Sequence, residues 1–282
     1  MLSDIEIDQI FNECKRKKSV AKKQSLVIFY PIYDHNLIKV LNNIKKWKTD
    51  NYLPCKFKKE SHIKVEPLKT SVSLFFLFMK KNINKTSSIN LINNEFLNVS
   101  GLEYNIGKCF NHIIYKSFEE IGLNQSISKS DLLYKVFFNN IFHDYSHMLF
   151  IDDTTKVIKS NWINYVYEKM KSEYFWILGS MILSRVNDHF NHDLYSIQMN
   201  ALYNVDDDCF KMFLKRVKED IPEKPFHIAI NEYRSDYSNF RIAQHTQHLF
   251  RYSRLFAAVK LQTSKVPLIM LNNTCFLTNV TF

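Results

Sequence analysis

The chain has 282 residues, of which 46% are hydrophobic and 23% are charged, so it can build a core and is not disordered by composition. It contains only four glycines, and no two of them have the spacing of a dinucleotide-binding or P-loop phosphate motif. Lysine and arginine outnumber aspartate and glutamate by 38 to 28. The net charge of +10 favours an anionic partner, although a lysine- and asparagine-rich composition explains it equally well.

The five cysteines are odd in number and widely spaced, and none of them forms a CxxC pair. This pattern predicts neither a disulfide framework nor a cysteine-based zinc site, and it favours a reducing compartment, for which we expect the cytoplasm. The basic stretch 15–23 is not followed by an apolar signal-peptide core, and the longest apolar runs are too short to span a membrane. We therefore expect a soluble chain whose basic N-terminus can contact an anionic membrane only peripherally.

The N-terminal part of the chain predicts a lead-in followed by a strand and a helix. Residues 1–24 are polar and basic, with a helix expected over 4–18. The β-rich apolar run 25–30 is stopped by Pro31 and predicts a buried strand. Apolar residues over 36–47 recur with helical spacing and predict a helix directly after it.

Strands and helices are expected to alternate along the rest of the chain. In order, the patterns predict a strand at 72–78, a helix at 101–121, a helix or mixed segment at 131–142, a strand at 148–151, a helix at 161–170, a strand at 174–183 and a helix at 209–218. This alternation predicts an α/β fold with a mostly parallel central sheet flanked by helices. We expect a single domain over 25–255, with 256–282 packing on it as a C-terminal extension.

A first group of candidate site residues lies in the string His143-Asp144-Tyr-Ser-His147. Two histidines four residues apart could bind one metal ion if they lay on a helix. The string is similar to that of HD-domain phosphohydrolases, in which His112 and an aspartate among Asp206–Asp208 would complete the metal site. A metal-dependent phosphohydrolase that uses His112, His143 and Asp144 is therefore one functional alternative. Exposed histidines before a strand are the simpler interpretation in a chain with 10 histidines.

A second group consists of Asp152 and Asp153, which directly follow the apolar run 148–151. The carboxyl ends of parallel strands meet at one edge of an open α/β sheet, where such folds bind ligands. Carboxylates at this edge suit Mg²⁺ or Mn²⁺ that bridges a diphosphate. The alternative is that Asp-Asp-Thr-Thr forms an ordinary solvated turn.

A third group surrounds Gly179. In a chain with so few glycines, a glycine inside an apolar run predicts a close approach of another group to the backbone. The polar residues 187–193 and Asn200 could then form an acceptor loop. A buried strand followed by an ordinary polar loop explains the same residues equally well.

The order of these segments resembles that of nucleotide-sugar glycosyltransferases of the GT-A type. The matching segments are the strand that leads to Pro31-Ile-Tyr-Asp34, then LFIDDTTKVIKSNW, FWILGS and NALYNV. The resemblance as a whole covers residues 25–255. The resemblance implies a single GT-A-like domain, in which a DxD-like acidic motif ends a central strand. It further implies transfer of a sugar from a nucleotide-diphosphate donor to an unknown glycan, lipid or protein acceptor. Separately, the basic residues are spread along the chain except at 15–23 and 56–59, and no DNA- or RNA-binding motif is visible, so we expect no nucleic acid as partner.

Two positions depart from the pattern of this family. The motif reads Asp152-Asp153-Thr154, so that threonine takes the place of the second acid, and Met199 takes the place of a glycine. These departures leave open a catalytically inactive binding protein on the same fold.

The resemblance also implies roles for individual residues. The donor would be held by Pro31, Tyr33, Asp34, Asp152, Gly179, Ser180, Asn200 and Arg251. The metal, Mn²⁺ or Mg²⁺, would be bound by Asp152, Asp153 and a late histidine, His248 or His245. The general base would be Asp188, Asp193 or one of Asp206–Asp208, for which we take Asp207. The simpler interpretation of Asp206–Asp208 is an acidic cluster that favours the dipole of the helix after it.

Overall fold

The computed structural model describes residues 24–33, 35–56, 71–79, 85–96, 106–122, 128–185, 193–235, 245–260 and 274–280. The helix expected at 4–18 and the basic stretch 15–23 lie outside these residues, as does part of the segment 256–282.

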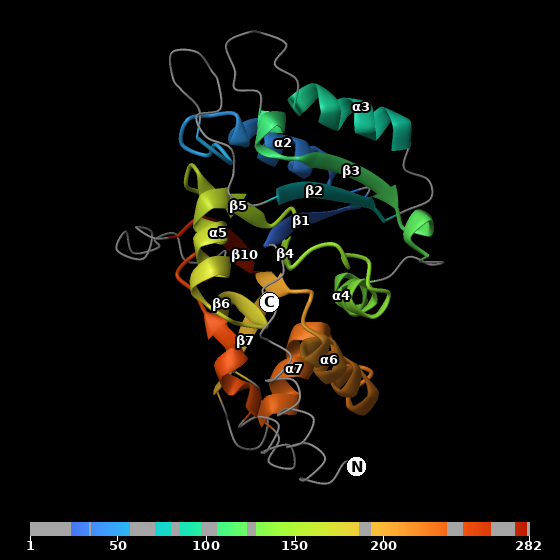
Figure 1. Cartoon of the computed structure of the whole chain (residues 1–282), viewed down its shortest axis with the longest axis vertical. Helices are drawn as coiled ribbons and strands as arrows, with labels where there is room; N and C mark the ends of the chain where they lie inside the picture. The colour runs from blue at the N-terminus through green and yellow to red at the C-terminus, as the bar shows by residue number, and fades with distance from the viewer. Residues whose placement is uncertain are drawn as a thin grey trace.

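A seven-stranded sheet in the order β3-β2-β1-β4-β7-β6-β8 forms the centre of the molecule (Figure 1). Its strands are β1 (Ser25–Ile32), β2 (Ser71–Phe78), β3 (His112–Ser117), β4 (His147–Phe150), β6 (Ile177–Arg185), β7 (Asp193–Asn204) and β8 (Phe250–Tyr252). β1 pairs in parallel with β2 and β4, β2 with β3, and β6 with β8, whereas β7 is antiparallel to β4 and β6. The predicted α/β fold with a mixed, mostly parallel sheet is confirmed.

Helices cover both faces of this sheet (Figure 1). On one face lie α2 (Leu37–Trp47), α3 (Lys85–Phe96) and α5 (Trp162–Ser172); on the other lie α4 (Lys129–Phe138), α6 (Asp208–Asp220) and α7 (Phe226–Ser235). The described residues also form short 3₁₀ helices at Ile106–Cys109, Glu119–Ile121 and Gln247–Leu249. The helices form because one side of each is apolar; α2, for example, buries Val40, Ile44 and Trp47 against the sheet.

A second, three-stranded sheet joins the C-terminal segment to the segment that follows β4. It consists of β5 (Thr155–Val157), β10 (Phe276–Val280) and β9 (Phe256–Lys260). β10 pairs with β5 in antiparallel register, Phe276 lying opposite Val157. The turn that carries Asp152 and Asp153 is therefore held between β4 of the large sheet and β5 of the small one.

The helix predicted over 101–121 is wrong, because residues His112–Ser117 form the edge strand β3. Apolar residues happen to recur there with helical spacing, but Ile113, Ile114 and Tyr115 also favour a strand, and pairing with β2 decides the outcome. The first strand also runs through Pro31 to Ile32, although proline was expected to stop it. Pro31 is tolerated because β4 pairs with β1 only as far as Phe29.

The expectation that the cysteines form no disulfide is wrong as well. Cys55, after α2, and Cys109, before β3, are joined by a disulfide with a sequence separation of 54 residues. Cys209 is also disulfide-bonded, whereas Cys275 is a buried free thiol. Cysteines so far apart meet only because β2 and β3 return the chain to the end of α2, and spacing alone does not indicate this.

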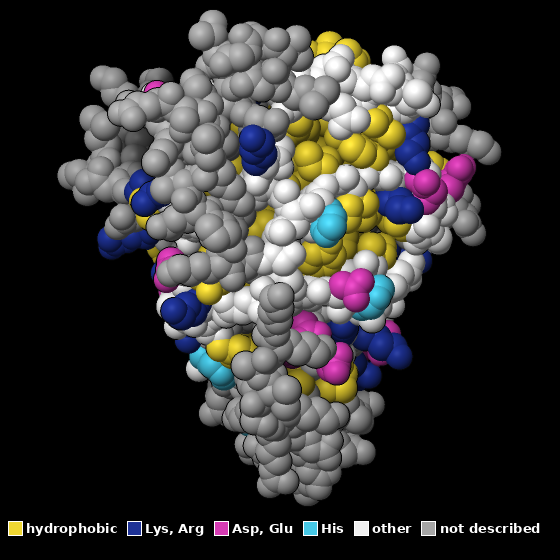
Figure 2. Space-filling view, turned by 45° about the horizontal axis from the view of Figure 1, so that its top comes forward, with side chains coloured by type: hydrophobic (Ala, Val, Ile, Leu, Met, Phe, Trp, Pro, Cys, Tyr) yellow, Lys and Arg dark blue, Asp and Glu magenta, His cyan; other side chains and the backbone are white. Residues whose placement is uncertain are grey.

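None of the helices in the described ranges is long and apolar enough to cross a membrane. On the face drawn in Figure 2, the described lysine and arginine side chains are spread among acidic and uncharged ones. A nucleic-acid groove requires a continuous basic stripe, and this face gives no support for one.

Candidate functional site

The order of the strands reverses between β1 and β4. β2 and β3 extend the sheet on one side of β1, whereas β4 lies on its other side. In open α/β sheets such a switch point leaves a crevice at the carboxyl ends of the two strands, where ligands bind. Tyr33 and Asn36 follow β1, and Asp152 and Asp153 follow β4, so the sequence-predicted acids lie at this crevice.

Asp152 is the centre of a buried hydrogen-bond network. Its Oδ1 accepts from the backbone N–H of Thr154 at 2.9 Å, from Thr154 Oγ1 at 2.6 Å and from Thr155 Oγ1 at 3.3 Å. Asn200 of β7 donates to the same oxygen from its Nδ2 at 3.3 Å. Asp152 therefore shapes its own turn and joins that turn to a strand 48 residues further along the chain.

Asp153 is held by the segment that follows β1. Its Oδ1 accepts from Asn36 Nδ2 at 3.3 Å, and its Oδ2 lies 3.4 Å from the ammonium of Lys39 in the first turn of α2. Asn36 Oδ1 in turn accepts from the backbone N–H of Tyr33 at 2.8 Å. The two strand ends are thus connected by polar contacts between residues about 115 positions apart.

A bulge between β6 and β7 aims Asn200 at this network. Gly179 lies opposite Ala201, but Met181 lies opposite Ile197, so β7 has extra residues across from Ser180. A Cβ atom on Gly179 would lie 2.9 Å from the side chains of both Ala201 and Ile197. The predicted close approach at Gly179 therefore exists, but it is made by β7 and not by a ligand. Such bulges commonly reorient a side chain next to a functional site.

A buried tyrosine, Tyr30, and a partly buried one, Tyr33, line the same region. Tyr30 accepts from Asn43 Nδ2 at 3.1 Å, and burial raises the pKa of its phenol, with Asp152 and Asp153 contributing. Burial and the same two carboxylates also raise the pKa of Tyr33. Both phenols are therefore neutral at physiological pH, and Tyr33 offers a flat ring, stacked on His35, beside the crevice.

The structure does not bring His248 or Arg251 to Asp152. In the order β4-β7-β6-β8, the strand that carries Arg251 lies three strand spacings, about 14 Å, from β4. His248 precedes β8, which is parallel to β6, whereas Asp152 follows β4, so the two residues lie at opposite edges of the sheet. Arg251 instead lies 3.6 Å from Glu173 and donates to the carbonyl of His248.

The candidate general bases are not assembled there either. Asp207 follows β7, whose last residue, Asn204, lies opposite the first residue of β4, so Asp207 is at the opposite edge from Asp152. It is the N-cap of α6, accepts from the N–H of Phe210 at 2.9 Å and bonds to the Tyr174 hydroxyl. Asp193, at the start of β7, is about 20 Å along the strand from Asn200. Asp188 and Asp34 lie outside the described residues.

The residues of the HD-type alternative are also dispersed. His112 is on β3 and His147 on β4, and β2 and β1 lie between them, which separates the strands by about 14 Å. A metal requires ligand atoms about 2 Å from it, so these side chains cannot share one. His143 and Asp144 are exposed in the turn before β4 and pair with each other at 3.3 Å. The phosphohydrolase interpretation is therefore wrong.

The carboxylates at the crevice are a poor match for a divalent cation. Four donors converge on Asp152 Oδ1, and both oxygens of Asp153 have protein partners. In the part of the chain that the structure describes, no group of three or more His, Cys, Asp or Glu side chains could hold a metal. Mg²⁺ and Mn²⁺ prefer several available oxygen ligands. The Mn²⁺ or Mg²⁺ expected from the resemblance stays a prediction that these residues do not favour.

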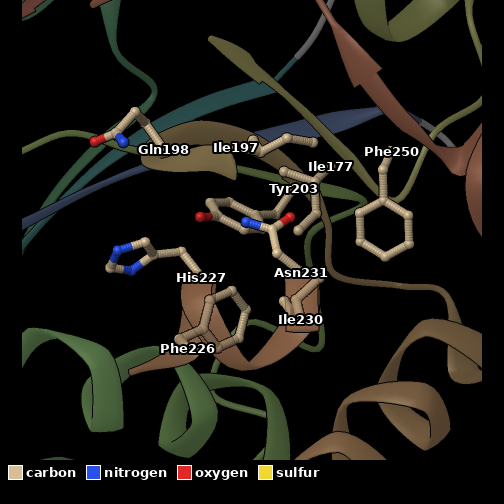
Figure 3. Close-up of a pocket in the computed structure, with 9 residues that line it drawn as sticks. All are labelled: Ile177, Ile197, Gln198, Tyr203, Phe226, His227, Ile230, Asn231 and Phe250. Carbon is tan, nitrogen blue, oxygen red and sulfur yellow. The ribbon is translucent and has the colours of Figure 1, made fainter. Parts of the chain in front are cut away.

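Two further hollows lie elsewhere. A small cavity between α7 and the sheet has a volume of about 10 Å³, room for about one water molecule (Figure 3). Figure 3 shows Asn231 and Tyr203 among the residues that line this cavity. Burial lowers the pKa of His227, which also lines it and lies on the same helix as Asn231. A more open groove of about 640 Å³ lies between α5 and the residues after β8, with Tyr165 and Tyr252 exposed along it.

No protein-family model matches the sequence, and no curated protein matches it. The structure resembles solved glycosyltransferases. The apo form of the bifunctional glycosyltransferase WbbM has a TM-score of 0.50 and 8% identity, covering 92% of this chain and 46% of that chain. Mouse xyloside xylosyltransferase 1, in its apo form, has a TM-score of 0.47 and 10% identity, covering 86% of this chain and 89% of that chain. The glycosyltransferase GlyE of Streptococcus pneumoniae has a TM-score of 0.44 and 8% identity, covering 83% and 46%.

The fold is thus the α/β fold of GT-A glycosyltransferases, and the predicted resemblance is confirmed at the level of the fold. The chain spans about half the length of WbbM and of GlyE.

Three residues of the crevice were missed in the sequence. Asn36 and Lys39 join β1 to Asp153, and Thr154 fills the site of the missing acid with a hydroxyl that binds Asp152. Asn36 could have been found in the sequence, because it lies at the expected start of the helix that follows the first strand. Nothing local distinguishes Lys39 among the 38 basic residues of the chain.

Proposed function

We propose that this chain is a glycosyltransferase that takes a sugar from a nucleoside-diphosphate donor bound at the crevice between β1 and β4. The observation that carries the proposal is the convergence of polar side chains from three elements at the switch point of a GT-A fold. Asn36 and Lys39 come from the start of α2, Asp152 and Asp153 from the end of β4, and Asn200 from β7. A switch point without a ligand has no need for such a long-range buried network.

The roles follow from the position of each group. Pro31, near the carboxyl end of β1, and Tyr33, in the turn after it, would hold the base and ribose of the donor. In the transfer step the bond between the anomeric carbon and the β-phosphate oxygen breaks, and its electron pair leaves with the nucleoside diphosphate. The acceptor oxygen bonds to the anomeric carbon and gives up its proton to a base. With Asp207 at the opposite edge, Asp188 is the candidate base that stays open.

A binding protein without transferase activity is the second candidate. It is favoured by Thr154 in place of the second acid and by the use of Asp207 as a helix cap. Such a protein would bind the donor at the same crevice but would not consume it.

One experiment separates these functions. Thermal unfolding is measured with UDP, GDP, CMP and their common sugar conjugates, each with EDTA and with Mn²⁺. A ligand at 100 times its Kd adds about 2.7 kcal/mol of stability, which a melting curve resolves. Stabilisation that Asp152→Ala abolishes, together with consumption of the donor, supports the transferase. Stabilisation without consumption supports the binding protein, and no stabilisation by any nucleotide rejects both.

The disulfide changes the expected location. Disulfides persist in oxidising compartments and are rare in the cytosol, so the bonded state of Cys55, Cys109 and Cys209 supports maturation in an oxidising compartment. The cytoplasmic location rested on the expected absence of disulfides and loses that basis.

A further inference from the structure

Lys39 places a positive charge where the helix alone would not favour one. It is in the first turn of α2, which already carries the positive end of the helix dipole, and cations there are unfavourable without a nearby anion. Its ammonium lies 3.4 Å from Asp153 Oδ2, and its side chain is 65% exposed. The ammonium is therefore fixed at the crevice yet reachable from solvent.

The start of α2 is open to an anion for a second reason. The helix has no acidic residue in its first turn and no side-chain cap. Asn36 stands at the N-cap position, but its Oδ1 accepts from Tyr33 and its Nδ2 donates to Asp153. Uncapped backbone N–H groups at a helix start, combined with a positive side chain, are a common way of binding phosphate.

An independent observation at the same crevice points to a ligand. Asn200 is 5% exposed and Ser180 is 2% exposed, and neither Asn200 Oδ1 nor Ser180 Oγ has a hydrogen-bond partner. The Asn200 amide also donates to Asp152 Oδ1 and Thr154 Oγ1, which places it in the site. Buried polar atoms are almost always paired in folded proteins, so unpaired acceptors here indicate a missing partner such as a ligand hydroxyl.

The carboxylates, by contrast, are already engaged. Asp152 uses one oxygen for four donors, and Asp153 uses its two oxygens for Asn36 and Lys39. Thr154 provides a hydroxyl where the GT-A pattern would provide the second acid of its motif.

We propose that the diphosphate of the donor is bound by Lys39 and the start of α2, so that donor binding needs no divalent cation. The ammonium supplies the positive charge that offsets the charge of the leaving nucleoside diphosphate, while Asp153 holds it in the crevice when the site is empty. This inference rests on the proposed function and specifies how the same site recognises its ligand.

The test is isothermal titration calorimetry with UDP, GDP and CDP and their common sugar conjugates, in buffer with EDTA and in buffer with Mn²⁺. At least one nucleotide should bind in EDTA, with a Kd within about threefold of that in Mn²⁺. Lys39→Ala should weaken binding by about tenfold or more, because a charge-assisted contact is lost. Lys39→Arg should retain most of the affinity. Lys46→Ala, an exposed lysine in the last turn of the same helix, is the matched control and should bind like the wild type.

Asp153→Asn distinguishes the two mechanisms directly. If Asp153 only positions Lys39, removal of its negative charge should leave nucleotide binding unchanged or make it tighter. If Asp153 binds a metal, the same substitution should abolish binding. Thermal unfolding of each variant shows that it is folded.

The outcomes are distinguishable. Binding only with Mn²⁺, lost in Asp153→Asn, overturns this inference and leaves the proposed function standing. Absence of binding by any nucleoside diphosphate or sugar conjugate in either buffer overturns the proposed function and this inference with it.

Discussion

The chain contains two runs of aspartate that look alike in sequence and have different surroundings in the structure. Asp152 and Asp153 follow β4, and Asp206–Asp208 follow β7. Because β7 is antiparallel to β4, the two runs lie at opposite edges of the same sheet. Asp207 caps its own helix through the N–H of Phe210, three residues away. It also bonds to Tyr174, which is 33 residues away. Asp152 also bonds within its own turn, but it and Asp153 in addition contact side chains that are 48 to 117 residues away.

This difference distinguishes an acid that caps a helix from acids that belong to a candidate ligand site. A cap is satisfied by the next turn of the chain and leaves no need for a ligand. The run after β4 gathers side chains from α2 and β7, and next to it Asn200 Oδ1 is buried without a partner. Whether a run of acids forms a ligand site is therefore indicated less by the number of acids than by how far along the chain their hydrogen-bond partners lie.

The strongest test of this comparison is Asp152→Ala, measured as the rate of donor consumption. The substitution removes the oxygen on which Thr154, Thr155 and Asn200 converge, so the turn and the amide lose their fixed positions. We expect a loss of about 1000-fold, or about 4 kcal/mol of transition-state stabilisation. Asp207→Asn, which keeps a good N-cap, is the control and should retain the wild-type rate. An Asp152→Ala protein within a few fold of wild type would contradict the placement of the site.

The sequence could predict part of this site. Asp152 and Asp153 follow a continuous apolar run, and the end of a buried strand is a recognisable place for a ligand. The network around them could not be predicted, because it depends on the bulge opposite Ser180 and on which strands are neighbours. His248 and Arg251 were misplaced for the same reason, since the position of β8 at the far end of the sheet has no signature in the sequence.

The half of the sheet that carries the site also has a covalent support. The disulfide between Cys55 and Cys109 closes a loop with a sequence separation of 54 residues, so the double substitution Cys55→Ser/Cys109→Ser should lower the free energy of unfolding by about 2–4 kcal/mol. Urea unfolding measures the change. Cys275→Ser, at the free buried thiol, is the matched control for loss of a sulfur atom. Equal stability of the double variant and the wild type would mean that the disulfide does not form.

The fold itself was largely predictable. Continuous apolar runs marked β1, β2 and β4, and helical spacing marked α2, α5 and α6. The prediction was wrong at β3, where Ile113 and Ile114 fit either period and the decision comes from pairing with β2. It was also wrong at Cys55 and Cys109, because a disulfide depends on which loops meet, and that is a property of the topology.

The start of β4, at the opposite end of the strand from Asp152, offers a third test. His147 starts the strand, is 8% exposed and has its ring 5.4 Å from that of Phe175, and burial lowers the pKa of its imidazole to about 4. Between about pH 4 and pH 6.5, His147 is protonated in the unfolded chain but neutral in the folded chain. Its contribution to stability is therefore complete above about pH 6.5 and is lost as the pH falls towards 4, by up to about 3 kcal/mol.

Urea unfolding at pH 7 and pH 4.5 measures this loss. His147→Gln should show a smaller drop in stability between the two pH values than the wild type does. His143→Gln, in the exposed turn four residues earlier, should drop as much as the wild type. If the two variants behave alike, His147 is not the buried neutral group that the structure describes.

The smallest expected effect is at the edge opposite the site. Asp207→Ala removes the cap of α6 and the bond to the Tyr174 hydroxyl, and it should lower the free energy of unfolding by about 1 kcal/mol. Asp207→Asn should cost less, because asparagine is an equally good N-cap. Urea unfolding measures the stability of both variants. Donor consumption should be unchanged in both, because Asp207 and Asp152 lie at opposite ends of the neighbouring strands β7 and β4. Should Asp207→Ala keep its stability and lose its activity, the acid would have to reach the reacting atoms, and opposite edges of one sheet do not allow that. Such a result would place the donor at the end of β7 and would make the network around Asp152 the structural one of the two.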